Sequence, residues 1–291
     1  MNRLSLAMAV LCVLSSQAEA HFEQSALVLR ARALGGAFVS RADDPSTVFV
    51  NPAGMVSPDA RALYVEYGEP AIADAEEESR LALVAGIKAI RLGFGWYRFG
   101  GADDASGNLI LAGAAWKLIE GTPGSFLSIG ATVSAGEISN GPSCCGGEGA
   151  TWSKVTGDAG VILKPLPVIS LAYAVGNLLN EHLDVEAEHA DRWSRVHRWG
   201  ISYAWEERVV LSLEERFIPG KTTFHYGFSF RAAVPLELMA GFSDGHTAGG
   251  VRLVGRRFRA AIAFTSGEGR EIAWTGSCEI PFRGAKKDGA D

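Results

Sequence analysis

Residues 30–55 read RARALGGAFVSRADDPSTVFVNPAGM, and this stretch decides how the rest of the chain is interpreted. Gly35 and Gly36 stand together where a bend is predicted, because glycine adopts backbone conformations that other residues avoid. Asp44 suits the position that caps a helix start, and Pro45 fits the first helical position, where its missing N–H costs nothing. The stretch therefore predicts a glycine bend followed by a short, capped helix.

The predicted helix has a definite end. Pro52 and Gly54 are expected to stop it after roughly two turns, since proline disfavours a helical residue before it and glycine is common after helix ends. From Arg61 onward the chain reads almost entirely as short strands. A glycine bend with a capped helix also occurs in many soluble proteins, so the long run of strands has to decide between the two interpretations.

Residues 1–20 have the features of a secretory signal peptide. Arg3 is followed by an apolar run over residues 4–14 and by Ala-Glu-Ala at residues 18–20, a small-x-small cleavage site. The apolar run is too short to remain as a membrane-spanning helix. We expect the mature chain to start near His21 and to be exported.

The composition favours a membrane barrel among exported proteins. The chain is 47% hydrophobic and contains 35 glycines. It has no uninterrupted apolar run of the length, about 18 residues, that a transmembrane helix needs. A helix-poor, glycine-rich, apolar chain is typical of a closed β-barrel, although a periplasmic β-sandwich shares much of this composition. The formal net charge of −6 argues against a nucleic-acid partner, which would require a basic face.

Two-residue alternation is the main strand signal, and it is clearest in the last third of the chain. In residues 224–231, FHYGFSFR, four aromatic side chains take one face, and histidine, glycine, serine and arginine take the other. Residues 258–265 and 272–282 alternate in the same way. In a barrel the apolar face would meet lipid and the polar face would line the lumen, whereas a soluble β-protein would turn its polar face to water.

About fourteen strands are predicted, with connections that alternate in length. Their starts lie near Arg61, Arg80, Ile90, Asn108, Ser125, Thr151, Val168, Trp193, Arg208, Thr223, Pro235, His246, Arg257 and Glu271. Connections after even-numbered strands are short, and those after odd-numbered strands include all the longer ones, although this difference fades toward the C-terminus. An even number of strands with short turns at one end and longer loops at the other is the signature of an outer-membrane barrel.

We therefore predict an all-β fold, a transmembrane antiparallel β-barrel with a short N-terminal plug segment. The expected divisions are residues 1–20 as the signal peptide, 21–57 as the plug, 58–282 as the barrel and 283–291 as a polar tail. The expected location is the outer membrane, whose lipids would be the first partner.

Three short motifs in the opening stretch resemble the N-terminal segment of the FadL-like outer-membrane transporters and the related PorV-like barrels. In that superfamily an alanine/leucine/glycine run, an Ala-Asp-Asp and an Asn-Pro-Ala-Gly precede the first barrel strand. Here these motifs are residues 33–38 (ALGGAF), 42–44 and 51–54. The resemblance covers about twenty-five residues, and the remaining chain matches as architecture only.

The resemblance implies passive uptake of hydrophobic small molecules, such as fatty acids or aromatic hydrocarbons. An extracellular apolar groove would capture the ligand, and movement of the plug would release it. The plug residues it implies are Gly35, Gly36, Asp43, Asp44, Asn51, Pro52 and Gly54. The chain is shorter than those transporters and lacks an obvious hydrophobic capture loop. A second interpretation therefore stays open, a PorV-like barrel with a sealed lumen that docks secreted proteins or an envelope complex.

Five basic side chains on the predicted inner face are candidate contacts for the polar head of a ligand. They are Arg216, His225, Arg231, Arg252 and Arg259. The same face also carries Glu214, Glu237 and Glu279. The alternative is therefore a lumen packed with paired charges that stabilise a narrow barrel, since buried charges are tolerated mainly when they are paired. We favour the paired-charge interpretation.

No catalytic, cofactor or metal site is predicted. Residues 241–245, GFSDG, match the nucleophile-elbow pattern, but they lie among strands and are interpreted as a hairpin turn. Cys144 and Cys145 are adjacent in a predicted long loop, and Cys278 lies in the last predicted strand, so one mature cysteine is left unpaired in any single-chain scheme. For the adjacent pair we favour a loop disulfide over a metal site, because no further ligand is nearby.

Overall fold

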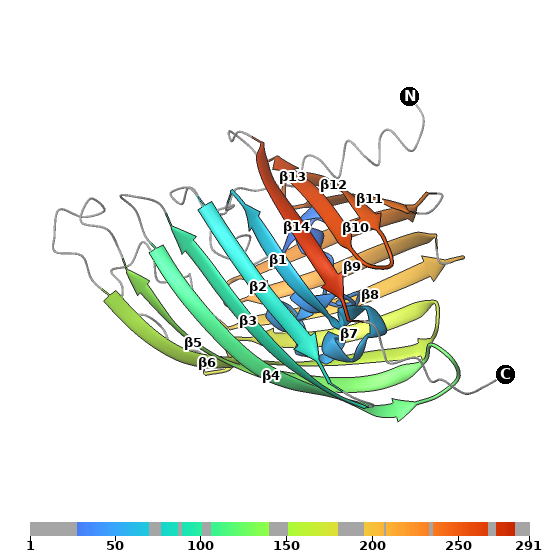
Figure 1. The fold of residues 1–291 in the computed structure, drawn as a ribbon, viewed down its shortest axis with the longest axis horizontal. Coiled ribbons are helices and arrows are strands. Elements are labelled where there is room, and N and C mark those ends of the chain that lie inside the picture. Colours follow the sequence, from blue (N-terminus) through green and yellow to red (C-terminus); the bar gives the residue numbers. More distant parts are fainter. Residues whose placement is uncertain are drawn as a thin grey trace.

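Fourteen antiparallel strands close into a barrel in the computed structural model (Figure 1), and β1 pairs with β14 to complete the ring. The strands are β1 (Ala62–Gly68), β2 (Glu77–Ala85), β3 (Ile90–Gly100), β4 (Ser106–Glu120), β5 (Phe126–Ser139), β6 (Thr151–Leu166), β7 (Ile169–Gly176), β8 (Val196–Trp205), β9 (Val209–Ile218), β10 (Lys221–Arg231), β11 (Leu236–Ser243), β12 (His246–Val254), β13 (Arg259–Ser266) and β14 (Ala273–Pro281). The closing pair places Leu63 opposite Ile280. The predicted fold and strand number are confirmed, and each predicted start lies within three residues of the observed one.

The structure describes residues 28–69, 77–86, 89–100, 106–139, 151–179, 195–206, 208–232, 235–266 and 272–282. The predicted signal peptide, the predicted polar tail and the Cys144–Cys145 pair lie outside these ranges. Within them, no helix has both the length and the apolar character needed to span a bilayer.

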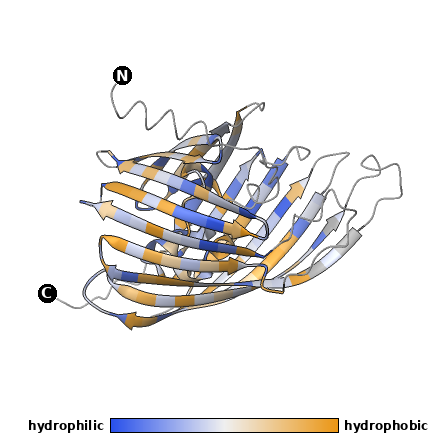
Figure 2. Ribbon diagram, turned by 180° about the vertical axis from the view of Figure 1, so that it is seen from behind, coloured by the Kyte–Doolittle hydropathy of each residue, from blue (hydrophilic) through white to orange (hydrophobic). Residues whose placement is uncertain are grey.

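Alternation along the strands separates an apolar outside from a more polar inside. On β10, Phe224 and Phe228 point outward and are 49% and 42% exposed, whereas the residue that follows each of them, His225 and Ser229, is buried. Hydrophobic and hydrophilic segments alternate along the strands for the same reason in Figure 2. A closed barrel with an apolar outer face has the pattern of a membrane-spanning barrel.

The two ends of the barrel differ in their connections. We call the end where β1 begins and β14 ends the short-turn end, and the opposite end the loop end. At the short-turn end only residues 167–168 separate β6 from β7, whereas residues 177–195 separate β7 from β8 at the loop end. The strands β4, β5 and β6 have 15, 14 and 16 residues, against 8 in β7, so one side of the wall is longer, as the green strands in Figure 1 show.

The chain before β1 lies inside the ring of strands. It forms α3 (Leu29–Ala33) and three 3-10 helices, η1 (Pro45–Phe49), η2 (Pro52–Val56) and η3 (Pro58–Ala60). We call residues 28–60 the N-terminal segment; it is the blue part of the ribbon that Figure 1 shows within the barrel. Its fully buried side chains include Leu29, Leu34, Phe38 and Met55. The segment therefore supplies much of the hydrophobic core.

The bend and the start of η1 form as the sequence predicts. The Asp44 carboxylate accepts a hydrogen bond from the Ser46 N–H at 2.9 Å, and Pro45 occupies the first helical position. The backbone φ angles of Gly35 and Gly36 are 63° and 96°. Both lie in the left-handed region, where a side chain would be strained.

The first helix does end before Pro52, since η1 stops at Phe49 and Asn51 is extended, but Pro52 and Gly54 themselves belong to a second helix that the sequence does not predict. Asn51 caps η2 by accepting a hydrogen bond from the Ala53 N–H at 3.2 Å, and Pro52 takes the first position. Proline fits there because the first N–H groups of a helix have no partner within it. Gly54 lies inside η2, where a Cβ would come 2.0 Å from the Ala42 carbonyl oxygen. Its role is to allow this close contact.

Ile262 tests which side of the wall meets lipid, since it lies in the middle of β13 and points outward. For Ile262→Arg we expect a loss of roughly 2–4 kcal/mol in the free energy of unfolding, because arginine at the bilayer midplane is costly. The same change at Ile272, just before β14, is expected to cost only about 0–1 kcal/mol. Both values can be measured by denaturant unfolding in lipid vesicles. Equal losses at the two positions would contradict a lipid-facing β13.

Candidate functional site

Glycines on the inner wall make room for the N-terminal segment. A Cβ at Gly241 would lie 2.0 Å from the Gly35 nitrogen, and one at Gly130 would lie 2.5 Å from the Pro52 carbonyl carbon. No side chain fits at such distances, so the segment packs directly on strand backbone. The other wall glycines that lie against the segment are Gly93, Gly95, Gly160, Gly200, Gly227 and Gly250.

The glycine bend is attached to the wall by His225 on β10. Its Nδ1 lies 2.7 Å from the Gly35 carbonyl oxygen, and its Nε2 lies 2.9 Å from the Thr223 hydroxyl. Because a carbonyl oxygen can only accept, Nδ1 carries the proton and Nε2 accepts from Thr223. A Cβ at Gly36 would lie 2.3 Å from Nδ1, so Gly36 is what allows the ring to approach. The structure thus places this predicted lumen contact against the N-terminal segment.

Glu214 on β9 holds the part of the segment that follows the bend. One carboxylate oxygen accepts hydrogen bonds from the backbone N–H groups of Phe38 at 3.0 Å and Val39 at 2.9 Å. The other oxygen accepts from Arg216 at 3.1 Å. Arg216, a predicted lumen contact, is therefore a buried member of an ion pair. Glu214, which the alternation of the strand places on the inner face, is the partner of Arg216 in this pair.

Glu237 on β11 is the centre of a cluster of buried charges. Its carboxylate lies 2.6 Å from Arg41, 3.4 Å from Arg252 and 3.8 Å from Arg30. Arg30 also pairs at 2.8 Å with Asp44, the residue that caps η1. Buried charges are costly unless they are paired. Here the charges of the wall and the charges of the N-terminal segment neutralise each other.

Asp43 adds a second carboxylate to Arg30, at 2.5 Å. Burial by itself raises the pKa of the Asp43 carboxyl, but the positive charges of Arg30 and Arg41 outweigh burial and hold this pKa below its ordinary value. Asp43 is therefore ionised at neutral pH. A lowered carboxyl pKa stabilises the folded state above the pKa of an unfolded aspartate, and this contribution is lost as the pH falls.

Glu279 on β14 carries the charged cluster to the short-turn end. Arg252 lies 2.7 Å from one of its oxygens and Arg259 lies 3.3 Å from the other. Arg259 also pairs at 2.6 Å with Asp59 of η3, which ties the end of the N-terminal segment to the rim. Arg231, the remaining predicted lumen contact, stands opposite Glu237 in the β10–β11 register, but it is exposed at the last position of β10.

A second cluster of charges lies near the loop end, on β1 and β2. Arg80 forms ion pairs with both Glu66 and Glu78. Arg32 of α3 also pairs with Glu78, and the backbone N–H of Leu29 donates to Glu66 at 2.8 Å. None of these residues is singled out by sequence, although Glu66, Glu78 and Arg80 occupy the inward positions of alternating strands.

Phe49 of η1 packs against all three hydrophobic clusters inside the barrel. The cluster nearest the loop end contains Tyr97 and Phe99 of β3, whose ring centroids are 5.6 Å apart, with Leu109 of β4 against them. The Arg80 guanidinium lies 4.2 Å from the centroid of the Tyr97 ring. Phe49 is only partly buried, unlike the other residues of η1. It therefore links an aromatic site near the loop end with the core around the N-terminal segment.

The remaining sequence candidates lie away from this interior. The GFSDG stretch forms the β11–β12 hairpin, with positive φ at Asp244 and Gly245, which confirms its interpretation as a turn. Cys278 is a free thiol on β14. Cys144 and Cys145 lie outside the described residues.

No protein-family model and no curated protein matches the chain. Solved structures do match. The CymD monoaromatic hydrocarbon channel aligns with a TM-score of 0.66 and 12% identity, covering 90% of this chain and 99% of that one. The Ralstonia pickettii toluene transporter TbuX aligns with a TM-score of 0.59 and 11% identity, covering 90% of this chain and 100% of that one. A Pseudomonas aeruginosa FadL homologue aligns with a TM-score of 0.55 and 11% identity, covering 88% of this chain and 98% of that one. The chain has the fold of these channels.

This likeness confirms at the level of fold the FadL-like architecture that the three short motifs imply. The PorV-like part of the resemblance stays a prediction. The same holds for the roles of the individual plug residues, whose positions the structure gives and whose movement it does not.

A substitution at Gly241 tests whether the position of the N-terminal segment depends on the absence of a side chain at this point of the wall. We expect Gly241→Val to displace the glycine bend, because the new side chain would occupy the position of the Gly35 backbone. The matched control is Gly249→Val on β12, where a Cβ would meet only ordinary contacts. Single-channel conductance in planar bilayers should rise for Gly241→Val and stay at the wild-type value for Gly249→Val. An unchanged conductance in both variants would contradict this packing model.

Glu237 tests the charged cluster. Glu237→Gln keeps the shape of the side chain and removes the charge that three arginines share. We expect the free energy of unfolding in vesicles to fall by about 3–5 kcal/mol, because a broken buried pair leaves an uncompensated charge. Glu120→Gln is the control, since Glu120 is 73% exposed and its pair with Lys117 contributes at most about 1 kcal/mol. If both variants lost only a similar, small amount of unfolding free energy, Glu237 would not be the centre of the charged cluster.

Proposed function

We propose that the chain is an outer-membrane channel for the passive uptake of hydrophobic small molecules. The apolar outer face of the closed barrel supports a membrane location, and the predicted signal peptide over residues 1–20 would deliver the chain there. The fold is shared with channels named for monoaromatic hydrocarbons and toluene. These neighbours support hydrophobic cargo as the class of ligand.

The observation that carries the proposal is the position of Phe49. A hydrophobic molecule that enters from the loop end would meet Tyr97, Phe99 and Leu109, and then Phe49, which packs against them. Hydrophobic contacts are non-directional, so cargo can take the place of these side-chain contacts without leaving a polar group unsatisfied. The path would continue along the apolar core that surrounds the N-terminal segment.

The N-terminal segment would then act as a plug with an anchored and a displaceable part. Residues 28–44 are anchored by the ion pairs of Arg30, Arg32 and Arg41 and by hydrogen bonds to the Glu214 carboxylate. Residues 45–56 pack mainly against the inner faces of β3 to β6. Hydrophobic cargo can replace apolar contacts but cannot replace ion pairs. Movement is therefore expected in η1 and η2, while the glycine bend stays in place.

Neutral cargo fits this interior better than a fatty-acid anion. The basic side chains that could receive a carboxylate headgroup, Arg216, Arg252 and Arg259, are each paired with a carboxylate of the protein. An anionic headgroup would have to break one of these pairs, which is costly in a buried site. A neutral aromatic hydrocarbon has no such requirement.

Uptake by whole cells tests the function. Cells that lack other channels for hydrophobic compounds are given this chain, and the uptake of radiolabelled toluene and of hexadecanoate is measured. We expect toluene uptake above that of cells without the barrel, and no gain for hexadecanoate. A toluene rate equal to that of barrel-free cells would overturn the proposed function.

Phe49 tests the path. We expect Phe49→Ala to raise the toluene rate by roughly twofold or more, because the truncation opens a cavity on the path. Phe224→Ala, an aromatic truncation on the outer face, should leave the rate unchanged. If Phe49→Ala transports at the wild-type rate while the barrel itself is active, cargo follows a different route.

A further inference from the structure

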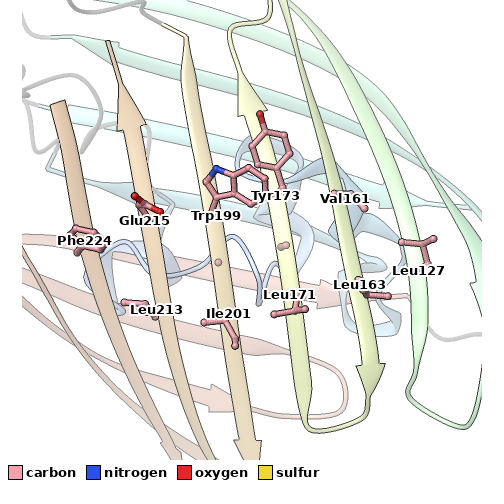
Figure 3. Close-up of a pocket in the computed structure, with 12 residues that line it drawn as sticks. Leu127, Val161, Leu163, Leu171, Tyr173, Trp199, Ile201, Leu213, Glu215 and Phe224 are labelled. Carbon is pink, nitrogen blue, oxygen red and sulfur yellow. The ribbon is translucent and has the colours of Figure 1, made fainter. Parts of the chain in front are cut away.

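A groove of about 580 Å³ lies on the outer wall of the barrel, across β5 to β10 (Figure 3). The side chains labelled in Figure 3 project from the outer face of the strands, and the N-terminal segment lies behind them in this view. Trp199 is 55% exposed and Phe224 is 49% exposed, as expected for outward positions. The groove is therefore separate from the interior path for cargo.

Two rows of side chains border the groove. In the first row Tyr173 stands opposite Trp199, Trp199 opposite Glu215, and Glu215 opposite Phe224. The rings of Tyr173 and Trp199 lie with their centroids 4.1 Å apart. This row is aromatic except for one carboxylate.

The second row is entirely aliphatic. Leu163 stands opposite Leu171, Leu171 opposite Ile201, and Ile201 opposite Leu213. From β5 to β10 there are five strand spacings of about 4.8 Å, so the groove is about 24 Å long. An extended acyl chain of a membrane lipid fits this length and this apolar lining.

The groove has a direction relative to the two ends of the barrel. Leu163 lies three residues before Leu166, the last residue of β6, at the short-turn end. Glu215 lies three residues before Ile218, the last residue of β9, at the loop end. The groove therefore crosses the wall diagonally, with its carboxylate near the loop end and its aliphatic row running deeper. A lipid has the same order of parts, a polar head at the surface and an acyl chain below it.

Glu215 is the one carboxylate among the described residues that line the groove. Its carboxylate faces outward between Trp199 and Phe224, and among the described residues it has no hydrogen-bond or ion-pair partner. A charge on the lipid face of a barrel is unfavourable, least so near the interface. A headgroup that donates hydrogen bonds and carries positive charge would satisfy it, since charge-assisted hydrogen bonds are the strong ones.

We propose that this groove binds one lipid of the surrounding bilayer, with its acyl chain along the aliphatic row and a primary ammonium headgroup against Glu215. An anionic headgroup is disfavoured by the like charge of the carboxylate. A trimethylated ammonium has the right charge but no N–H to donate, so it is the informative comparison. The site rests on the membrane location of the barrel and not on the transport activity.

Native mass spectrometry of the purified full chain tests the site. The detergent-solubilised protein is mixed with equimolar phosphatidylethanolamine, phosphatidylcholine and phosphatidylglycerol, and the lipids that stay bound are counted. We expect phosphatidylethanolamine to be retained roughly tenfold over phosphatidylcholine, in line with the usual strength of hydrogen bonds to charged groups. Equal retention of the two lipids by the wild-type chain would overturn the proposal.

Two variants separate the headgroup contact from the acyl contact. Glu215→Gln should bring the ratio of the two lipids close to one, while Glu120→Gln, a change at an exposed carboxylate elsewhere, should keep the wild-type ratio. Ile201→Trp fills the groove and should reduce the retention of all three lipids. A wild-type lipid ratio in Glu215→Gln would show that the headgroup does not contact Glu215. Full lipid retention in Ile201→Trp would show that the acyl chain does not lie in the groove. Either result overturns the proposal, and neither bears on toluene uptake.

Discussion

The interior of this barrel depends on the pairing of arginines with carboxylates across the boundary between the wall and the N-terminal segment. Glu237 of the wall meets Arg30 and Arg41 of the segment, and Glu78 meets Arg32. Each of these side chains is buried, so each would carry a large desolvation cost without its partner. Glu237 and Glu78 also pair with Arg252 and Arg80 of the wall, so the arginines of the segment complete charge networks that begin in the wall. The lumen and its contents form one structural unit.

Two kinds of contact divide the N-terminal segment. Ion pairs hold residues 28–44, whereas residues 45–56 lie mainly against strand backbone and apolar side chains, with Gly93, Gly95 and Gly130 providing the space. The wall also donates hydrogen bonds to the second part, from Arg198 to the Val50 carbonyl and from Ser128 to the Ala53 carbonyl. Polar contacts need a partner in a fixed geometry, and apolar contacts do not. This difference explains how a barrel that is filled by its own chain can also be proposed to admit hydrophobic molecules. The part that is easiest to exchange is the part nearest the aromatic cluster.

Sequence predicted the strands well because alternation is a local property: each strand shows its two faces in its own residues. The cap at Asp44 is local in the same sense. Pairing inside the barrel is not, since Arg41 and Glu237 are 196 residues apart. The second helix, η2, was missed because proline both follows helices and begins them, and only the first role was assigned to Pro52. The sequence did not indicate a site at Glu215, since the residues that surround it belong to the neighbouring strands and not to its own.

The enclosure of the N-terminal segment constrains the order of assembly. The segment precedes β1 in the chain, and the ring closes only when β1 pairs with β14, the last strand. If the ring closed first, the charged side chains of Arg30 and Arg41 would have to enter a narrow interior in which the segment and the wall are too close for a Cβ at several glycines. We therefore expect the sheet to curl around a segment that already lies against it. The N-terminal segment is thus expected to be in place against the sheet before β1 and β14 close the ring.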